Sequence, residues 1–438
     1  MGPRILIIGA GKSATVLIQY LQQKAVENDW YIILADGDAH TANRKWNNAP
    51  NGKAIGIDIE NELERKNLVQ NADIVVSMLP ANLHFLVAKD CVHFEKPLFT
   101  ASYVDDNMRS IASEIEAKKL LFLCEMGLDP GIDHMSAMAI IDEIHEKGGK
   151  ITSFKSHCGG LVAPESDDNP WHYKISWNPR NIILAGKAGA IYLEKGENVN
   201  KEYSHIFAQT PIVEVAGVGP LAYYPNRNSL SYIDTYKLHG VNDFVRTTLR
   251  YPAFCSGWNV IVQLQMTDET VISIGSGTTV KNWFEQHIQA KGLENQLAKF
   301  LQDPALKQQL EFIGLFESTL IPVQFNSNAT ILQWLLEGKW KLEPTDKDLV
   351  VMLHEIEYSI GSRQFKIDSS MVLTGDDAIH TAMAKTVGLP LAMGVCAYLK
   401  GEIKMNGLHI PIDARIYKPI LKTLAQEGIV FQETLTSY

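Results

Sequence analysis

The first 130 residues alternate short apolar runs with amphipathic segments. Runs with the length of buried strands lie at residues 4–8, 31–35, 54–57, 74–79, 97–101 and 120–124. Segments with helical periodicity separate them, at residues 12–25, 61–70, 82–94 and 105–118. Strands that alternate with helices predict an α/β fold with a parallel, doubly wound sheet.

The hydrophobic pattern changes beyond about residue 150. Longer segments that mix β-branched, aromatic and polar residues predict a second, mixed or antiparallel sheet with helices on one face. These segments lie at residues 151–158, 188–193, 244–251 and 349–358. Residues 281–342 have helical periodicity and predict a small helical insertion, whereas the apolar tail from residue 380 is expected to pack back onto earlier layers.

These shifts predict a chain of more than one domain, since single cores rarely grow beyond about 250 to 300 residues. We expect a first domain at residues 1–130, onto which 380–438 packs, an α/β domain formed by 131–280 and 343–379, and a helical domain at 281–342.

A glycine-rich turn follows the first apolar run. It has the pattern Gly-x-Gly-x-x-Ala, formed by Gly9, Gly11 and Ala14. Gly9 allows the tight turn, Gly11 lets a pyrophosphate approach the main chain, and Ala14 lets the next helix pack close to the sheet. Phosphates are favoured at a helix N-terminus. The turn therefore predicts a dinucleotide site that includes Gly9, Ala10, Gly11, Lys12 and Ser13.

Asp36, at the end of the second predicted strand, narrows the choice of dinucleotide. A carboxylate there can accept hydrogen bonds from both ribose hydroxyls of NAD and would repel the 2′-phosphate of NADP. Arg44 and Lys45 follow in the same region and could hold a 2′-phosphate if Asp36 turned away. NAD is the expected cofactor, and NADP stays an alternative.

The net charge of −10 and the pI near 5.7 disfavour nucleic acid and anionic membranes as partners. No apolar run reaches the roughly 18 residues that span a bilayer, and a core strand is expected from residue 4 instead of a signal peptide. We therefore expect a cytoplasmic protein. Its five cysteines are scattered and are expected to be reduced. His157 and Cys158 are neighbours on a predicted strand, so their side chains should point to opposite faces.

Polar residues also follow several other predicted strands. Asn82 and Ser102 are expected at the carboxyl edge of the first sheet, where each could cap a helix or bind a ligand. Asp129-Pro-Gly131 could be a plain turn, or a functional loop at the end of the last strand. Residues 158–180 combine glycines, acids and tryptophans, and a metal site there is disfavoured because no histidine lies at ligand spacing.

Two arginines, Arg227 and Arg250, lie on separate predicted segments. Arginine binds carboxylates through two parallel hydrogen bonds. If the fold brought both into one pocket, they would suit an amino-acid or hydroxy-acid substrate.

Several motifs in the same order resemble the saccharopine dehydrogenase family, most of all its glutamate-forming members, the saccharopine reductases. They run through most of the chain: residues 102–104, 127–134, 158–165, 169–177, 224–227, 248–251 and 381–390. The resemblance implies a variant Rossmann domain, an α/β substrate domain that also mediates homodimers, and a small helical domain. It implies NAD(P)-dependent oxidation of saccharopine to glutamate and aminoadipate semialdehyde, or the reverse condensation, in lysine metabolism.

The resemblance also assigns roles to residues at matching positions. Substrate would be held by Ser102, Tyr103, Asp129, Arg227, Thr248, Leu249, Arg250 and Tyr251. The cofactor would be lined by Gly9 to Ser13 and by Asp36, Asp58, Met78, Leu79, Thr100, Leu128, Asp129, Pro130 and Ser176. Asp129 would be the polar group nearest the reacting amine, where it orients the amine or a water molecule.

The sequence departs from the family pattern at two places. Fungal members usually carry an arginine-containing loop after the second strand and use NADP, whereas Ala35-Asp36-Gly37-Asp38 stands here. After Arg250 the family usually continues Tyr-x-Gly-Phe, whereas this chain has Tyr251-Pro-Ala-Phe-Cys255. Alternative readings are a dehydrogenase for carboxynorspermidine or lysine, and a nucleotide-binding relative without catalysis.

Overall fold

The computed structural model describes residues 2–438, which divide into two compact units. Unit 1 comprises Met1–Gly148 and Ile379–Phe431, and unit 2 comprises Gly149–Ala378 and Gln432–Tyr438. The expected boundary near residue 130 falls inside unit 1. The helix that follows it, α7 (Ile132–Glu146), packs against α17 (Ala414–Gln426) of the same unit, where Tyr417 donates a hydrogen bond to Asp142.

Unit 1 contains a seven-stranded sheet in which every strand pairing is parallel. Its order is β16-β6-β5-β4-β1-β2-β3. The strands are β1 (Arg4–Ile8), β2 (Tyr31–Asp36), β3 (Gly52–Gly56), β4 (Ile74–Ser77), β5 (Leu98–Thr100), β6 (Leu121–Leu123) and β16 (Gly407–His409). Strand order reverses direction between β1 and β4, and ligands bind open parallel sheets at the carboxyl edge beside such a point.

The helices of unit 1 include elements that the hydrophobic pattern did not resolve. The helix expected at 12–25 begins as a 3-10 turn (Lys12–Ala14) and continues as α1 (Thr15–Asn28), and the one expected at 105–118 is divided at Ile111 into α5 and α6. The other helices are α2 (Ala39–Trp46), α3 (Glu62–Gln70), α4 (His84–His93), α5 (Asp106–Ser110), α6 (Ala112–Ala117) and α16 (Ala382–Leu399).

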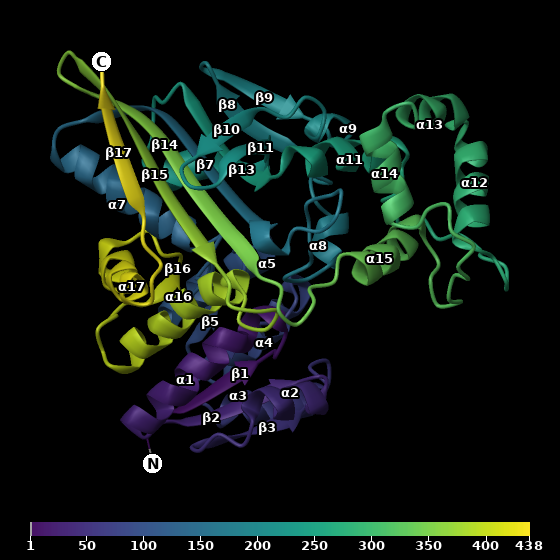
Figure 1. The fold of residues 1–438 in the computed structure, drawn as a ribbon. Helices are drawn as coiled ribbons and strands as arrows, with labels where there is room; N and C mark the ends of the chain where they lie inside the picture. The colour runs from purple at the N-terminus through teal and green to yellow at the C-terminus, as the bar shows by residue number, and fades with distance from the viewer. Residues whose placement is uncertain (1) are drawn as a thin grey trace. The chain divides into compact units, whose positions relative to one another are not determined.

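Helix α16 lies side by side with α1 (Figure 1). By length and mean hydropathy, 1.4, it reaches the range of membrane-spanning helices, which differs from the expectation that no such run exists. However, 78% of this helix is buried inside the protein. It is therefore a core helix of unit 1, to which Ile379–Phe431 belong, whereas the last residues of the tail, Gln432–Tyr438, belong to unit 2.

Unit 2 is built on a ten-stranded mixed sheet. The main path runs β10-β11-β13-β7-β14-β15-β17, with β8, β9 and β12 attached beside it. Its long central strands are β7 (Lys150–Val162), β14 (Asp348–Ile360) and β15 (Arg363–Thr374). The others are β8 (Ala190–Glu194), β9 (Glu197–Lys201), β10 (Ile212–Val215), β11 (Gly219–Pro225), β12 (Arg227–Asn228), β13 (Asp243–Arg250) and β17 (Gln432–Ser437). Only the pairings β13·β7 and β12·β8 are parallel.

An aromatic core supports the helices of unit 2. Trp171, Trp258 and Trp340 are fully buried together with Tyr173 and Phe254, with ring centroids 5.0–6.4 Å apart. The segment expected to be helical holds α12 (Val280–Lys291), α13 (Glu294–Phe300), α14 (Pro304–Phe312) and α15 (Asn328–Lys339). The remaining helices are α8 (Arg180–Ile183), α9 (Tyr203–Ile206), α10 (Ser231–Thr235) and α11 (Pro252–Gln263).

Candidate active site

The carboxyl edge of the parallel sheet gathers most of the residues predicted to line a cofactor. The glycine-rich turn follows β1, Asp36 ends β2, Asp58 follows β3, and Met78 and Leu79 follow β4. Thr100 ends β5, and Leu128, Asp129 and Pro130 lie beyond β6. Ser176 belongs to unit 2, so its cofactor role stays a prediction from the resemblance.

The glycine-rich turn leaves space for a phosphate group. Gly9 has φ +105°, and a Cβ there would lie 2.7 Å from the carbonyl oxygen of Met78, so only glycine fits. A Cβ built at Gly11 would meet no atom within 4 Å. The open space above Gly11, next to the N-terminus of the following helix, fits a pyrophosphate.

The Asp36 carboxylate faces this turn. Its Oδ2 accepts a hydrogen bond from Ala10 N at 2.6 Å, and its Oδ1 accepts one from Asp38 N at 2.9 Å. Lys45 Nζ donates to the carbonyl oxygen of Gly11 and to Thr15 Oγ1. Burial, aided by the nearby Arg44, lowers the pKa of Lys45 to about 8. Asp36 has therefore not turned away, and Lys45 is tied to the turn.

Asp58 differs in setting from Asp36. It is exposed, and its carboxylate accepts a hydrogen bond from Glu60 N at 2.9 Å in the loop that follows β3. This local bond fixes the loop but leaves the carboxylate accessible at the same edge of the sheet.

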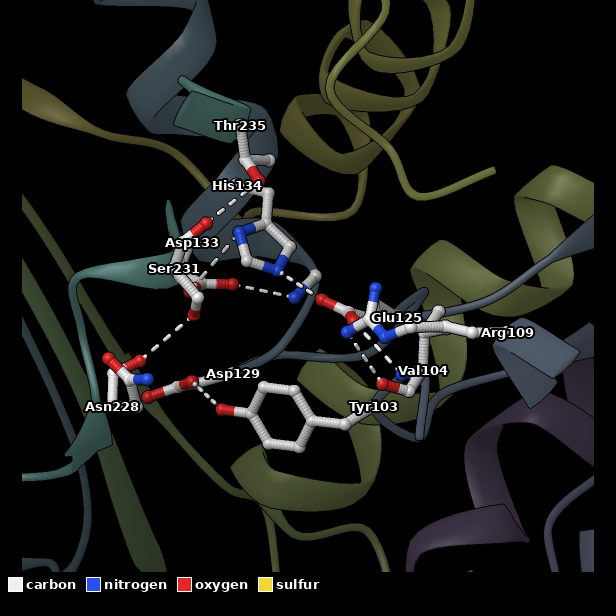
Figure 2. A network of polar contacts seen from close by, with 11 residues as sticks. Tyr103, Val104, Arg109, Glu125, Asp129, Asp133, His134, Asn228, Ser231 and Thr235 are labelled. Atoms are coloured by element: carbon white, nitrogen blue, oxygen red, sulfur yellow. Dashed lines mark hydrogen bonds and ion pairs between the residues drawn. The ribbon is translucent and has the colours of Figure 1, made fainter. Parts of the chain in front are cut away.

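The loops after β5 and β6 carry the predicted polar group of the reaction. Tyr103 donates a hydrogen bond to Asp129 Oδ1 at 2.9 Å, and Figure 2 shows the tyrosine ring directed at this carboxylate. The peptide bond between Asp129 and Pro130 is cis. The loop is therefore an ordered element in which an acid and a phenol are paired.

A buried set of charged and titratable side chains lies beside this loop. His134 Nε2 is 2.8 Å from Glu125 Oε2, and its Nδ1 is 3.6 Å from Asp133 Oδ2 (Figure 2). Glu125 Oε1 also accepts from Val104 N, and Asp133 Oδ1 accepts from Gly131 N. Asp133 thus bonds to the main chain of Gly131, the residue that precedes α7, while Glu125 joins the loops after β5 and β6.

The capping alternatives for Asn82 and Ser102 are wrong. Asp105 is the N-cap of α5, and Leu83, without a side-chain bond, precedes α4. Ser102 instead has its hydroxyl 2.7 Å from His84 Nε2, and Asn82 lies within a 3-10 turn.

In unit 2, the predicted substrate residues of β13 divide between the two faces of its sheet. Thr248 and Arg250 share one face with Arg246, because side chains alternate along a strand. Leu249 points the other way and is fully buried in an apolar cluster, so only its main chain can take part in binding on the face of Arg250. The register places Thr248 opposite Cys158 and Thr247 opposite His157, which confirms that His157 and Cys158 lie on opposite faces.

Arg250 is the most unusual of these residues. Its side chain is 6% exposed and lies 5.3 Å from the centre of the Tyr173 ring. Nη1 donates to the carbonyl oxygens of Gly160 and Leu249, and Nε is buried with no hydrogen-bond partner. Within residues 2–438 no carboxylate forms an ion pair with Arg250. A buried cation in this state favours an anionic ligand.

Arg227 does not lie beside Arg250. It is exposed in β12, and its neighbour Asn226 donates a hydrogen bond to the carbonyl oxygen of Arg246. Arg227 belongs to β12, and its neighbour Asn226 meets β13 at Arg246, four residues or about 13 Å before Arg250, so the two arginines are not joined in one cluster. Tyr251 begins α11, and its hydroxyl donates to the carbonyl oxygen of Val162.

The sequence reasoning did not single out His84, Glu125, His134 or Arg246 as part of a site. No local sequence pattern distinguishes these residues, because each acts through partners on other strands or loops. His134 stood in segment 127–134, one of the motifs that carry the family resemblance, which was the local indication.

Family models match both parts of this architecture. A model described as "Saccharopine dehydrogenase NADP binding domain" matches residues 5–123, and one described as "Saccharopine dehydrogenase C-terminal domain" matches residues 127–429. The chain belongs to the saccharopine dehydrogenase family. The family resemblance and the fold class expected from the sequence are thereby confirmed.

Among relatives, the chain is 30% identical to the saccharopine dehydrogenase [NADP(+), L-glutamate-forming] of Schizosaccharomyces pombe, over 99% of both chains. It is 32% identical to the mitochondrial alpha-aminoadipic semialdehyde synthase of Mus musculus, over 99% of this chain but 48% of that protein. The chain thus spans about half the length of the mammalian relatives. A solved structure of apo saccharopine dehydrogenase (L-Glu forming) from Saccharomyces cerevisiae matches with a TM-score of 0.89 and 28% identity, covering 99% of this chain and all of that one.

Proposed function

We propose that this chain is an NAD(P)-dependent dehydrogenase that acts on the CH–NH bond of saccharopine and forms glutamate. The observation that carries the proposal is the buried guanidinium of Arg250. It has no acidic partner among the residues that the structure describes and lies on the face of β13 that it shares with Thr248. Saccharopine carries several carboxylates, and the separate positions of Arg227 on β12 and Arg250 on β13 suit an elongated substrate with anionic groups far apart.

A bound nicotinamide nucleotide would supply the hydride acceptor. The residues of the chain would bind and orient this nucleotide. The turn from Gly9 to Ser13 accommodates its pyrophosphate, and the edge of the sheet after β4 and β5 accommodates the rest of the nucleotide. Oxidation of the secondary amine gives an imine, and water then divides it into glutamate and aminoadipate semialdehyde. Asp129, held by Tyr103, is assigned to the proton on the reacting nitrogen or on the attacking water.

The substrate assignments rest unevenly on the structure. Five of the predicted substrate residues present a polar group, either in the loops after β5 and β6 or on the face of β13 that carries Arg250. They are Ser102, Tyr103, Asp129, Thr248 and Arg250. Leu249 would contribute through its main chain, and Tyr251 through its ring or by fixing the start of α11.

For the nucleotide, we propose a preference for NAD over NADP in spite of the NADP named for the fungal relatives. Asp36 points at the turn with both oxygens held, where it suits the ribose hydroxyls and repels a 2′-phosphate. Lys45 is engaged by Gly11 and Thr15, and Arg44 is exposed on another side of α2, so neither replaces Asp36 as the neighbour of the ribose.

One experiment tests both the proposed substrate and the proposed nucleotide preference. The absorbance of the reduced nicotinamide is followed with saccharopine, in parallel with NAD and NADP. Rapid reduction of NAD, and slower reduction of NADP, is the expected result. Absence of reduction with either, while both nucleotides bind, would contradict the substrate assignment; carboxynorspermidine and lysine are then assayed. Binding without turnover on any of them would support a non-catalytic relative.

The assembly and the cellular context are part of the same proposal. A homodimer is inferred from the family, the lack of nucleic-acid and anionic-membrane partners is inferred from the net charge of −10, and a cytoplasmic location is kept as the expectation of the sequence analysis. Sedimentation equilibrium tests the first: a mass near 98 kDa, about twice the 48.8 kDa of one chain, is expected. Fractionation of the source cells tests the second.

A further inference from the structure

His84 joins two strand ends of unit 1 through both of its ring nitrogens. Its Nδ1 lies 2.7 Å from Ser77 Oγ at the end of β4, and its Nε2 lies 2.7 Å from Ser102 Oγ beyond the end of β5. Ser77 is fully buried, His84 is 5% exposed, and Ser102 is partly exposed. The chain of contacts therefore leads from the core to the carboxyl edge where ligands bind.

The imidazole is neutral in this setting. Burial lowers the pKa of His84 to about 4, against a smaller opposing effect of Asp105. A neutral imidazole has one nitrogen that donates and one that accepts. The direction of each hydrogen bond is therefore fixed once the tautomer is known.

Ser77 selects the tautomer. Its hydroxyl has His84 Nδ1 as its only hydrogen-bond partner among the described residues, and its side chain is 0% exposed. If Nδ1 carried the proton, the Ser77 hydroxyl would accept that proton's bond and its own buried proton would have no acceptor, an arrangement that folded proteins avoid. Ser77 must donate to Nδ1, so Nε2 carries the proton and donates to Ser102 Oγ.

This direction leaves the hydroxyl proton of Ser102 for a ligand. The hydroxyl has no hydrogen-bond partner other than His84 within residues 2–438. The main chain of Ser102 is held as well: its N–H donates to Thr100 Oγ1 at 3.2 Å, and its carbonyl oxygen accepts from Glu125 N at 3.0 Å. The side chain thus projects from a fixed backbone, in the loop that also carries Tyr103.

We propose that Ser77 and His84 are positioning residues that make Ser102 a hydrogen-bond donor to a carboxylate of the substrate. The role of Ser102 toward substrate rests on the proposed function. The direction of the relay does not, because it follows from the three side chains alone.

The tautomer is the first test and needs no turnover. Long-range proton–nitrogen spectra of protein with ¹⁵N-labelled histidine distinguish the two neutral forms, and the signals of His84 are assigned by their loss in His84→Gln. We expect the Nε2–H form, and in Ser77→Ala we expect a mixture, because the residue that enforces the choice is gone. An Nδ1–H form, or no change in Ser77→Ala, would overturn the relay.

Steady-state kinetics then test whether the relay from Ser77 through His84 to Ser102 serves substrate binding. Ser102→Ala is expected to raise the KM for saccharopine about 10- to 100-fold, the range of one hydrogen bond to a charged group, while nucleotide affinity and kcat stay near wild type. Ser77→Ala should raise this KM by less, because its mixture of tautomers still includes the form that makes Ser102 a donor. The double variant should be no worse than Ser102→Ala, since both changes remove one donor. Ser110→Ala, an exposed serine of α5 whose hydroxyl bonds to Asn107, is the control and should leave KM unchanged.

The two tests separate the possible failures. Multiplying effects of Ser77→Ala and Ser102→Ala would overturn the relay, and an unchanged KM in both would overturn the assignment of Ser102 to substrate. If saccharopine is not a substrate at all, the spectra still decide the direction of the relay, so failure of the proposed function is recognised separately.

Discussion

The guanidinium of Arg250 is satisfied only in part by the protein. Two main-chain carbonyls and two aromatic rings surround it, and its Nε has no partner. Such a group binds a carboxylate without first breaking an ion pair. The planar fork of arginine matters here because lysine offers one point charge in place of two parallel donors.

Arg250→Lys should therefore weaken productive substrate binding and leave the nucleotide site intact. Loss of one or two charged hydrogen bonds corresponds to about 1.5 to 3 kcal/mol, so kcat/KM for saccharopine should fall about 10- to 100-fold. Initial rates and nucleotide titrations measure the two effects. Arg363→Lys, an exposed position at the start of β15, is the matched control, and an equal loss in both variants would argue against a substrate role for Arg250.

Asp129 presents a different chemical question, because its carboxylate is already hydrogen-bonded to Tyr103. Asp129→Asn keeps the shape but removes the negative charge. If the carboxylate manages a proton on the reacting nitrogen or water, kcat should fall by about 10²- to 10⁴-fold, the usual range for a general acid or base. Full turnover with a normal KM would rule that role out, and Tyr103→Phe separates loss of the carboxylate from loss of its partner.

At this scale the sequence predicts some residues well and others not at all. Gly9, Gly11 and Asp36 could be placed because strand, turn and helix are adjacent in the chain, so a local pattern determines their geometry. Leu249 was predicted together with its neighbours although strand alternation turns its side chain to the opposite face. His84 could not be predicted, because its role depends on Ser77 at the end of β4 and on Ser102 in the loop after β5.

Among the elements, the central strands of unit 2 are joined by a polar chain on the face opposite Arg250. His157 of β7 lies 2.7 Å from Thr247 Oγ1 of β13 and 3.0 Å from Glu355 Oε2 of β14. Glu355 also pairs with Lys366 of β15 at 2.8 Å. Four neighbouring strands thus share one network, which fixes their register as well as their pairing.

This network predicts a pH dependence of stability. The hydrogen bond from His157, helped by Lys366, lowers the pKa of Glu355 from 4.5 to about 2, so the folded protein favours the carboxylate. The stabilisation is fully present above pH 4.5 and is lost as the pH falls toward 2, and it amounts to at most about 3 kcal/mol.

Denaturant unfolding at several pH values measures it. Glu355→Gln should be less stable than the wild type at pH 7, and the difference should shrink between pH 5 and pH 3. A difference that stays constant over this range would show that the ionised carboxylate is not the source. Glu357→Gln, exposed on the same strand, is the control.

Packing of two helices in unit 1 depends on one glycine. Gly388 of α16 lies against α1, where an added Cβ would come within 2.8 Å of the main-chain nitrogen of Leu17. Gly388→Ala should therefore lower the free energy of unfolding by about 1 to 3 kcal/mol through overpacking. Gly338→Ala, in α15 with nothing within 4 Å of the new atom, should instead raise it by up to about 1 kcal/mol. The same sign for both substitutions, measured by urea unfolding, would contradict the packing argument.

The element pattern was predictable where periodicity is strong and less so where pairing is distant. The first six strands of unit 1 were placed within a few residues because each is a short apolar run, whereas the edge strand β16 was not predicted. Strands β15 and β17 were not predicted: β15 mixes charged and polar residues, and every residue of β17 is exposed. β15 forms on the edge that β14 supplies, and β17 forms on the edge that β15 supplies, which is information that lies outside their own sequence.

At the scale of the whole molecule, the chain leaves unit 1 after Gly148 and returns to it at Ile379. The returning segment supplies α16, which covers α1, α17, which packs on α7, and the edge strand β16. The first 148 residues alone would therefore expose the apolar faces of two helices. The sequence indicated this return through the apolar tail, although it did not show that the last strand, β17, pairs with β15 in the other unit.

A fragment of residues 1–148 should consequently not fold by itself, even though it contains the whole glycine-rich turn. We expect it to lack a cooperative thermal transition and to bind a hydrophobic dye, because the buried surface of α16, 78% of that helix, has no substitute. Co-expression with residues 379–431 should restore a cooperative transition and stabilisation by nucleotide, since the second segment completes the core. A cooperative transition of the 1–148 fragment alone, with nucleotide raising its midpoint, would show instead that the first six strands suffice and that the returning segment only reinforces them.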